Sequence, residues 1–254
     1  MKRILILGGT TEARLLAERL AGRRELDVTL SLAGRTASPA RQPVPVRSGG
    51  FGGAAGLADY LSGERIDVLI DATHPYASGI SANALVAGRK TGVPFVMLQR
   101  PPWTAVEGDR WVEVNDVPAA ARALGEPPRR VFVTLGRNEL APFADAPQHH
   151  YLIRSVDPVD PPLPLPHVVY LTGRGPFAEA DDRALMAERG IDAVIAKNSG
   201  GSATYGKIAA ARSLGVTVIM LRRPPAPDAP TVATIEDAIA WLDHAFTSTT
   251  ARGV

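Results

Sequence analysis

The stretch GVPFVMLQRPP at residues 92–102 recurs as GVTVIMLRRPP at residues 215–225. Each copy is an apolar, strand-like run that ends at two prolines, where a regular strand must stop. Further short motifs recur in the same order, namely LGG at 7–9 and LGR at 135–137, GR at 34–35 and at 173–174, and ID at 66–67 and at 191–192. Chance does not readily produce ordered matches of this kind, so we expect an internal duplication.

Short apolar runs alternate with helical patterns along the whole chain, which is typical of a parallel sheet covered by helices on both faces. We therefore predict an α/β protein with two similar Rossmann-like, doubly wound parallel-sheet domains and a ligand cleft between them. The expected strands are 4–7, 28–32, 68–70, 95–98, 131–135, 168–171, 194–196 and 216–221. The expected helices are 12–20, 78–89, 177–189, 202–214 and 235–246, the last with Thr234 and Asp237 as a capping box.

The expected domain boundaries follow from the repeat. They are residues 1–103 for an N-terminal domain, 104–128 for a connecting strand and helix, 129–246 for a C-terminal domain and 247–254 for a tail. The stretches after the two Arg-Pro-Pro motifs, 111–124 and 232–246, could pack on either sheet.

Composition excludes several classes of protein. The 254 residues are 45% hydrophobic and 21% charged, which is the globular range. The formal net charge of +2, with no concentrated basic patch, does not indicate a nucleic-acid partner. The chain has no cysteine, so disulfides and thiolate chemistry are excluded and a reducing compartment is favoured. No run suits export or membrane insertion, so we expect a cytoplasmic protein, whose oligomeric state stays open.

The segment ILILGGTTEAR at residues 4–14 reads as a strand that turns through glycines into a helix. The free N–H groups and dipole at such a helix start suit a phosphate. The third glycine of the usual dinucleotide fingerprint is missing, so a plain strand-to-helix turn remains the alternative. The candidate cofactor-binding residues of this turn are Gly8, Gly9, Thr10, Thr11, Glu12 and Arg14.

The end of the second strand bears on the choice of cofactor. An acid at this point would bind the ribose hydroxyl of NAD, but the sequence has Gly34, Arg35 and Thr36. The arginine favours the 2′-phosphate of NADP over NAD. A glycine cluster at 48–53 follows, and Ser48, Gly49 and Gly50 offer N–H groups to the cofactor unless the cluster is only a flexible loop.

The segment DATHPYA at residues 71–77 ends the third of these strands, at the edge where open parallel sheets bind ligands. His74 and Tyr76 are the candidate catalytic residues, as proton donors or as packing partners of a nicotinamide. The alternative for His74 is a residue that only caps the following helix. Ala72, Thr73, His74 and Pro75 are candidate cofactor-binding residues.

Equivalent loops in the second half carry cationic and small polar residues that suit an anionic ligand. They are Gly136, Arg137, Arg174, Lys197, Asn198, Ser199, Gly200, Gly201, Thr204 and Lys207. The histidines show no metal-ligand spacing, so we expect no metal site. The chain has no G-x-S-x-G elbow and no P-loop, which argues against a hydrolase or a kinase.

Taken together, GGTTEAR at 8–14, Gly34-Arg35, DATHPYA at 71–77, Arg100-Pro101 and KNSG at 197–200 resemble the precorrin-6A reductase family over nearly the whole chain. The resemblance implies an NADPH-dependent reductase of cobalamin biosynthesis that converts precorrin-6A to precorrin-6B, with Arg100 among its substrate-binding residues. A close relative acts on the cobalt-containing intermediate, and these motifs do not separate the two.

The residues accommodate that chemistry. A precorrin carries many carboxylates, which Arg137, Arg174, Lys197 and Lys207 could bind. Hydride transfer from NADPH, bound by the N-terminal domain, to a macrocycle bound by the C-terminal domain needs mainly proximity. No dedicated acid is required where the substrate arrives protonated on a ring nitrogen. Two other classes stay open, a two-domain nucleotide-sugar glycosyltransferase and a non-catalytic ligand-binding protein.

Overall fold

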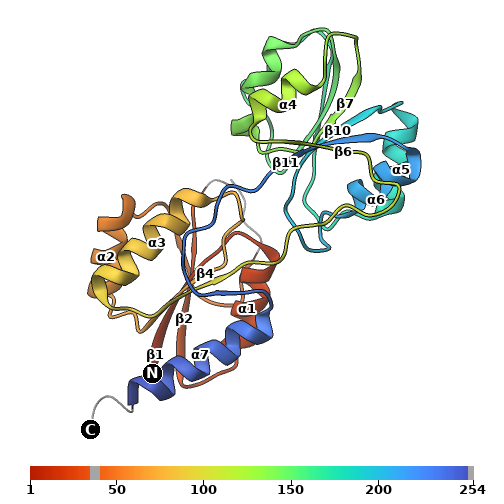
Figure 1. Ribbon diagram of the computed structural model, residues 1–254. Coiled ribbons are helices and arrows are strands. Elements are labelled where there is room, and N and C mark those ends of the chain that lie inside the picture. The colour runs from red at the N-terminus through yellow and green to blue at the C-terminus, as the bar shows by residue number, and fades with distance from the viewer. Residues whose placement is uncertain (35–40, 251–254) are drawn as a thin grey trace. The chain divides into compact units, whose positions relative to one another are not determined.

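The computed structural model describes residues 1–34 and 41–250, which form two compact units (Figure 1). The first unit contains residues 1–101 and the C-terminal segment from Pro225, and the second contains Pro102–Pro224. Each unit is built on a six-stranded sheet in which every pair of neighbouring strands is parallel. The α/β fold with two similar doubly wound sheets is therefore confirmed.

The sheet of the first unit has the order β12-β5-β4-β1-β2-β3. Alternate residues of its strands face opposite helical layers, because side chains alternate along a strand. Ile4, Ile6 and Ile70 pack with α1 and α7, whereas Leu5 and Leu7 pack with α2 and α3. Figure 1 shows these two pairs of helices on opposite faces of the sheet. The elements are β1 (Lys2–Leu7), α1 (Thr11–Ala21), β2 (Leu26–Leu32), β3 (Val46–Ser48), α2 (Gly53–Gly63), β4 (Val68–Asp71), α3 (Ser78–Thr91), β5 (Phe95–Leu98), β12 (Thr231–Val232) and α7 (Ile235–Thr250).

The sheet of the second unit has the order β6-β11-β10-β7-β8-β9. Phe132, Val194 and Met220 pack with Met186 of α5 and Ile208 of α6 in its main core cluster. The elements are β6 (Trp111–Val114), α4 (Val117–Ala123), β7 (Arg130–Val133), the 3₁₀ turns η1 (Arg137–Glu139) and η2 (Ala141–Asp145), β8 (His150–Ser155), β9 (Val168–Thr172), α5 (Glu179–Glu188), β10 (Ala193–Lys197), α6 (Gly206–Leu214) and β11 (Thr217–Leu221).

The two sheets have the same strand order once the repeat is taken into account, but they exchange their last strands. β6 follows β5 along the chain and yet pairs with β11, in the register Val218↔Trp111. β12 follows β11 and pairs with β5, in the register Thr231↔Met97. Each half of the duplicated chain therefore supplies the outermost strand next to the other half's fifth strand.

This exchange differs from the expected domain boundaries. The segment 104–128 belongs to the second unit rather than to a connector, and the C-terminal segment from Pro225 belongs to the first unit. The physical reason lies in α7, whose buried Ala238 and Leu242 pack in the core cluster of β1, β2 and α1. An apolar stripe shows that a helix has a buried face, but it does not say which sheet that face covers.

The expected strands and helices are present. In the part of the chain that the structure describes, the helix α2, the strands β3 and β8 and the 3₁₀ turns η1 and η2 were not expected. The N-cap of α7 is confirmed, because the Thr234 hydroxyl accepts from Asp237 N–H at 3.1 Å. The second contact joins the two side chains, since the same hydroxyl donates to Oδ2 of Asp237 at 2.7 Å. In the described part of the chain, no helix combines the length and the apolar character that crossing a membrane requires.

Candidate functional site

The turn after β1 lies in close contact with both β2 and α1. A Cβ atom at Gly8 would lie 2.6 Å from Leu30 Cδ1 and 3.3 Å from the Cβ of Ala13, so no larger residue fits there without displacing its neighbours. Gly9 has φ +114°, which L-residues rarely adopt. Gly8 thus supplies the close strand–helix approach that a third glycine supplies in the usual dinucleotide fingerprint.

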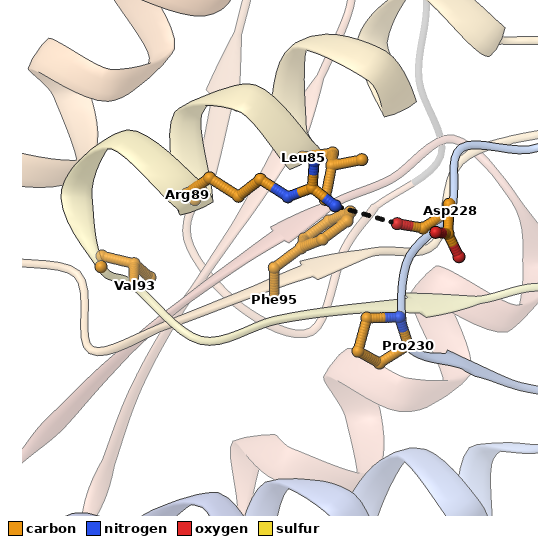
Figure 2. A pocket seen from close by; sticks show the side chains of 8 residues that line it. Leu85, Arg89, Val93, Phe95, Asp228 and Pro230 are labelled. Atoms are coloured by element: carbon orange, nitrogen blue, oxygen red, sulfur yellow. Dashed lines mark hydrogen bonds between the residues drawn. The ribbon is translucent and has the colours of Figure 1, made fainter.

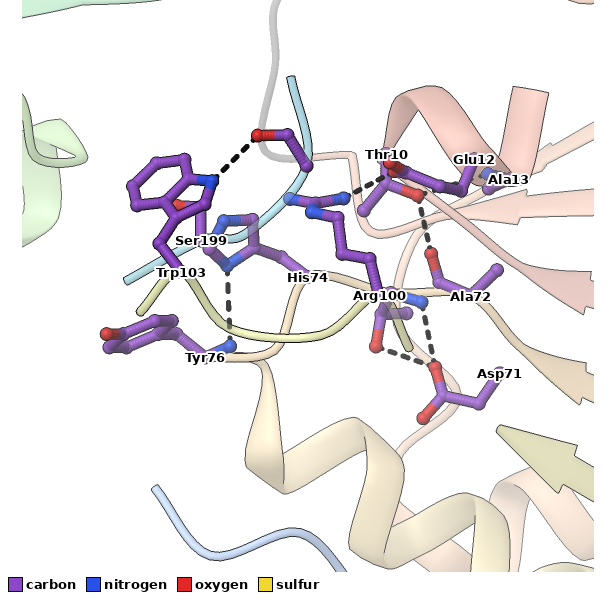
Figure 3. Close-up of polar contacts among 12 residues, drawn as sticks. Thr10, Glu12, Ala13, Asp71, Ala72, His74, Tyr76, Arg100, Trp103 and Ser199 are labelled. Atoms are coloured by element: carbon purple, nitrogen blue, oxygen red, sulfur yellow. Dashed lines mark hydrogen bonds and ion pairs between the residues drawn. The ribbon is translucent and has the colours of Figure 1, made fainter. Parts of the chain in front are cut away.

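Thr10 fixes the start of α1 and connects it to the end of β4. Its hydroxyl accepts from Ala13 N–H at 3.1 Å and donates to the carbonyl of Ala72 at 2.7 Å (Figure 3). The N–H groups of Thr11 and Glu12 are among those that an α-helix leaves without an intrahelical partner. They lie at the positive end of the helix dipole, so this turn suits an anionic group such as a phosphate.

Two further residues of this turn have partners that the sequence did not reveal. Glu12 forms an ion pair with Arg100, which follows β5, and the two side chains are about one-fifth exposed (Figure 3). Arg14 pairs with Glu18 one turn further along α1, at 3.1 Å. Arg100, expected to bind substrate, therefore belongs to the first unit and contacts the residues expected to bind cofactor.

The loop after β4 is a tight turn organised by a buried carboxylate. Asp71 is 2% exposed, and its Oδ1 accepts from the N–H of Thr73 at 2.9 Å and from its hydroxyl at 2.6 Å (Figure 3). Nδ1 of His74 accepts from the N–H of Tyr76 at 3.3 Å, and the two rings lie 5.5 Å apart. An accepting Nδ1 places the proton of neutral His74 on Nε2.

The ends of β1 and β4 are adjacent, because Leu7 pairs with Asp71. The structure thus brings the candidate residues at 8–12 and 72–76 together at the carboxyl edge of the sheet.

The ends of β2 and β3 meet at a second pair of glycines. A Cβ at Gly34 would lie 3.6 Å from the N atom of Gly49, whose N–H donates to the carbonyl of Leu32 at 2.9 Å. Ser48, Gly49 and Gly50 therefore lie beside the point where the segment after Gly34 begins. Arg35 and Thr36 lie outside the described residues.

Arg47 was not identified from the sequence, although it organises this glycine turn. Its guanidinium donates to the carbonyls of Gly49 at 2.6 Å and Gly50 at 2.7 Å, and it lies 3.7 Å from the ring centroid of Phe51. The sequence does show an arginine close to a pair of glycines, which could have pointed to this role. It does not show which carbonyl groups the side chain binds.

In the second unit the candidate substrate-binding residues follow β7, β9 and β10, at one edge of the sheet. Nζ of Lys197 lies 2.5 Å from Oε2 of Glu139, and the same oxygen accepts from Gly136 N–H at 3.1 Å. Arg137 and Arg174 are exposed. This edge therefore presents cationic side chains, one of which is engaged by a carboxylate of the chain itself.

Lys207 is part of the interior beneath this edge. It is 5% exposed, and its ammonium donates to the carbonyl of Thr204 at 2.7 Å. Burial, together with the nearby charge of Arg154, lowers the pKa of Lys207 to about 7, against an opposing effect of Asp182. Arg154 and Asp182 are themselves joined at 2.5 and 3.4 Å. Lys207 thus supports the loop from below.

The cavity in Figure 2, of about 250 Å³, lies away from these residues. Its lining includes Leu85 and Arg89 of α3, Phe95 at the start of β5, and Asp228. The start of β5 is at the amino edge of the sheet, opposite the loops described above, and none of the candidate residues lines the cavity. Within residues 1–34 and 41–250, no three His, Asp or Glu side chains gather as a metal-binding group.

A doubly wound parallel sheet whose central strand leads through a glycine turn into a capped helix defines an α/β protein of the Rossmann type. The family model described as precorrin-6x reductase CbiJ/CobK matches residues 3–243. The chain belongs to this family, which confirms the resemblance seen in its motifs.

Similar proteins agree with that assignment. A precorrin-6A reductase from Sinorhizobium sp is 56% identical over 95% of this chain and 93% of its own, and one from Rhodobacter capsulatus is 49% identical over all of both chains. A solved structure of CobK precorrin-6A reductase superimposes with a TM-score of 0.93 at 48% identity, covering 96% of this chain and 97% of that one. A cobalt-precorrin-6A reductase from Priestia megaterium is 27% identical over 94% of this chain and 97% of its own.

Proposed function

We propose that this protein reduces precorrin-6A to precorrin-6B, with NADPH as the hydride donor to one double bond of the macrocycle. The observation that carries the proposal is the turn Gly8–Gly9–Thr10, which starts α1 at the centre of the first sheet and is bonded to the loop after β4. The lack of cysteine suits a reducing compartment, so the cytoplasm is part of the proposal.

The residues of the first unit fit a pyridine dinucleotide. Gly8 and Gly9 let the backbone approach a pyrophosphate closely, and the N–H groups at the start of α1 would hold its charge. The Glu12–Arg100 ion pair keeps the ends of β1 and β5 together beside that turn. The reduced nicotinamide supplies a hydride when bound, and the protein supplies orientation and exclusion of water.

The residues of the second unit fit a ligand that carries several carboxylates. Arg137 follows β7, Arg174 follows β9 and Lys197 is the last residue of β10, all at one edge of the sheet. Guanidinium and ammonium groups bind carboxylates well. In this proposal Lys207 and Asn198 act beneath that surface, because each is more than nine-tenths buried. Reaction requires the two carbons that exchange the hydride to come within about 3–3.5 Å.

His74 and Tyr76 take a modest role in the proposal. The His74 Nδ1 bond to Tyr76 N–H presents Nε2–H as a donor beside the glycine turn. Such a group can orient a nicotinamide amide or deliver a proton. Neither task is indispensable, because the conjugated macrocycle can accept electrons without a dedicated acid. His74→Ala should therefore lower kcat by about 10-fold or less, and a near-total loss with intact binding would make it the essential proton donor.

The cobalt-free intermediate is the favoured substrate. The relatives named for precorrin-6A are 42–56% identical to this chain, whereas those named for the cobalt form are 27–28% identical. An anaerobic assay that follows NADPH absorbance with each form decides the question. Oxidation with precorrin-6A alone, or much faster with it, supports the proposal; oxidation with neither form overturns it.

Cofactor choice is tested separately through Arg35. If its guanidinium binds the 2′-phosphate, Arg35→Ala should raise KM for NADPH about 10-fold or more while leaving KM for NADH nearly unchanged. Equal losses for the two cofactors would remove that role from Arg35. Arg24→Ala, which removes an exposed arginine before β2, is the matched control.

A further inference from the structure

Trp103 belongs to the segment between β5 and β6, yet its backbone is bound by the loop that follows β10. Its N–H donates to Oδ1 of Asn198 at 2.7 Å, and Nδ2 of Asn198 donates to its carbonyl at 2.9 Å. Both halves of one side-chain amide are thus bonded to a single residue. The side-chain amide thus makes the same pair of hydrogen bonds to the Trp103 backbone that a neighbouring strand would make. The two bonds hold Trp103 and Asn198 in a fixed position relative to one another.

The indole of Trp103 is held by the same loop. Its Nε1–H donates to the carbonyl of Gly201 at 2.7 Å, a contact between residues 98 positions apart (Figure 3). The ring lies 5.5 Å from that of Tyr205 and 5.3 Å from Nζ of Lys207. Contacts therefore reach Trp103 from the start, the middle and the end of the segment 198–207, so this segment is folded around the indole.

The loop needs such a partner because of its glycines. Gly200 and Gly201 have φ +67° and +69°, and two successive glycines have a broad range of conformations in the absence of other contacts. The indole N–H fixes the Gly201 carbonyl and so selects one of these conformations. Holding a ligand-binding loop in its bound form reduces the entropy lost on binding.

We propose that Trp103 is the positioning residue of the macrocycle-binding loop at 197–201: it sets the loop's conformation through its backbone and indole hydrogen bonds and does not itself contact the macrocycle. This inference rests on the proposed function, which assigns that loop to the substrate.

Trp103→Phe tests it in the full-length enzyme. Phenylalanine keeps an aromatic ring and the backbone bonds to Asn198 but removes the donor to Gly201. We expect KM for precorrin-6A to rise about 10-fold, which corresponds to about 1.4 kcal/mol, the size of one hydrogen bond. KM for NADPH should change less than 2-fold, which also shows that the variant is folded.

Trp111→Phe is the matched control. Trp111 is also partly buried in the second unit, but its Nε1 has no hydrogen-bond partner among the described residues. The same substitution there should leave both KM values unchanged. A rise in KM for precorrin-6A of equal size in both variants would overturn the inference, since the effect would then not depend on the Gly201 bond.

Hydrogen exchange separates positioning from direct contact. In the absence of substrate, Trp103→Phe should speed amide exchange in 198–205 and leave exchange in α1 unchanged. If KM for precorrin-6A rises while amide exchange in 198–205 is unchanged, the indole contacts the substrate directly, and the positioning role is wrong.

Lys197→Ala, measured in parallel, separates this inference from the proposed function. If Lys197→Ala raises KM for precorrin-6A and Trp103→Phe does not, the positioning role is wrong and the substrate site stands. If neither variant changes it, the loop does not bind the macrocycle, and both assignments fail.

Discussion

After β1 the chain turns through Gly8 and Gly9 into the 11-residue helix α1, whereas after β7 it turns through Gly136 and Arg137 into the short 3₁₀ turn η1. The two turns occupy the same place in the repeat. In the first, the helix start is capped by a neutral hydroxyl, that of Thr10. In the second, the carboxylate of Glu139 accepts from Gly136 N–H and binds Lys197.

Under the proposed function, this difference gives the two halves of the duplicated fold different binding roles. A long helix with a neutral cap keeps its positive end available for an external anion. A 3₁₀ turn offers a weaker dipole, and in this chain a carboxylate of the protein already accepts from the N–H of its N-cap residue, Gly136. The first turn is thus suited to a phosphate, whereas the proposed function assigns binding of anions in the second half to side chains such as Lys197.

The largest effect is expected when Gly9 of the first turn is replaced by a residue with a Cβ, because the second turn has Arg137 at the corresponding position. Gly9→Ala places a Cβ at φ +114°, a strain of about 2 kcal/mol. If the strain is relieved by reshaping the turn, KM for NADPH should rise about 30-fold. Steady-state kinetics with precorrin-6A held saturating would measure the effect.

Gly136→Ala is its partner in the second half. Gly136 has φ −68°, and a Cβ there would meet the carboxyl group of Glu139, with Oε2 at 3.0 Å and Cδ at 4.0 Å. We expect no change in KM for NADPH from this variant. Losses of similar size in the two variants would show that the turns do not differ in function.

The second comparison is between Ala84 in α3 and Lys207 in α6. Each residue is buried and lies eight residues before the glycine C-cap of its helix, Gly92 in the first unit and Gly215 in the second. The unfolded chain keeps a lysine protonated up to its ordinary pKa of 10.5, but folded Lys207 has a pKa of about 7. Its burial therefore lowers stability at and below pH 7, and this cost disappears as the pH rises from 7 to 10.5.

Lys207→Met should consequently increase the free energy of unfolding at pH 7 by about 2 kcal/mol, with less gain at pH 9.5. Urea unfolding at both values measures this difference. Lys90→Met, at an exposed site in the last turn of α3, should show no such pH dependence. A variant less stable than the wild type at pH 7 would mean that the bond to Thr204 outweighs the burial of the amine.

The repeat and the apolar runs were sufficient to predict the α/β architecture, because central strands such as β4, β5 and β10 are buried on both faces and lack the alternation of a surface strand. They could not predict α2, whose sequence GAAGLADYLSG contains three glycines. Gly56 is required by packing, since a Cβ there would lie 1.8 Å from the carbonyl oxygen of Phe51. From the sequence alone, a glycine such as Gly56 indicates a break in a helix, although here it allows the helix to lie close to the backbone of Phe51.

The candidate site was predictable where it depends on neighbours in the sequence. The Gly8–Gly9 turn is local, and so is the segment 71–77. Trp103 and the Glu12–Arg100 pair depend on contacts between different elements, and in the second case the partners are 88 residues apart. The exchange of β6 and β12 was left open for the same reason, because it is decided by tertiary packing.

A milder change to the first turn alters only its cap. Thr10→Val removes the acceptor for Ala13 N–H and the donor to Ala72, so unfolding should become about 1 kcal/mol easier and KM for NADPH should rise about 5-fold. Thr10→Ser keeps both bonds and should restore both values. A valine variant with normal KM for NADPH would show that the contact with Ala72 does not shape the cofactor site.

The smallest expected effect concerns the carboxylate of the second turn. Glu139→Gln keeps an acceptor for Gly136 N–H but removes the charge that engages Lys197, whose side chain is 17% exposed. If Glu139 competes with substrate carboxylates, KM for precorrin-6A should fall about 3-fold at low salt, and the gain should shrink as salt is added. Glu188→Gln, at an exposed position in α5, is the control. A rise in KM instead would show that Glu139 holds Lys197 in place for the macrocycle, so that the second turn also takes part in binding, through its carboxylate rather than its dipole.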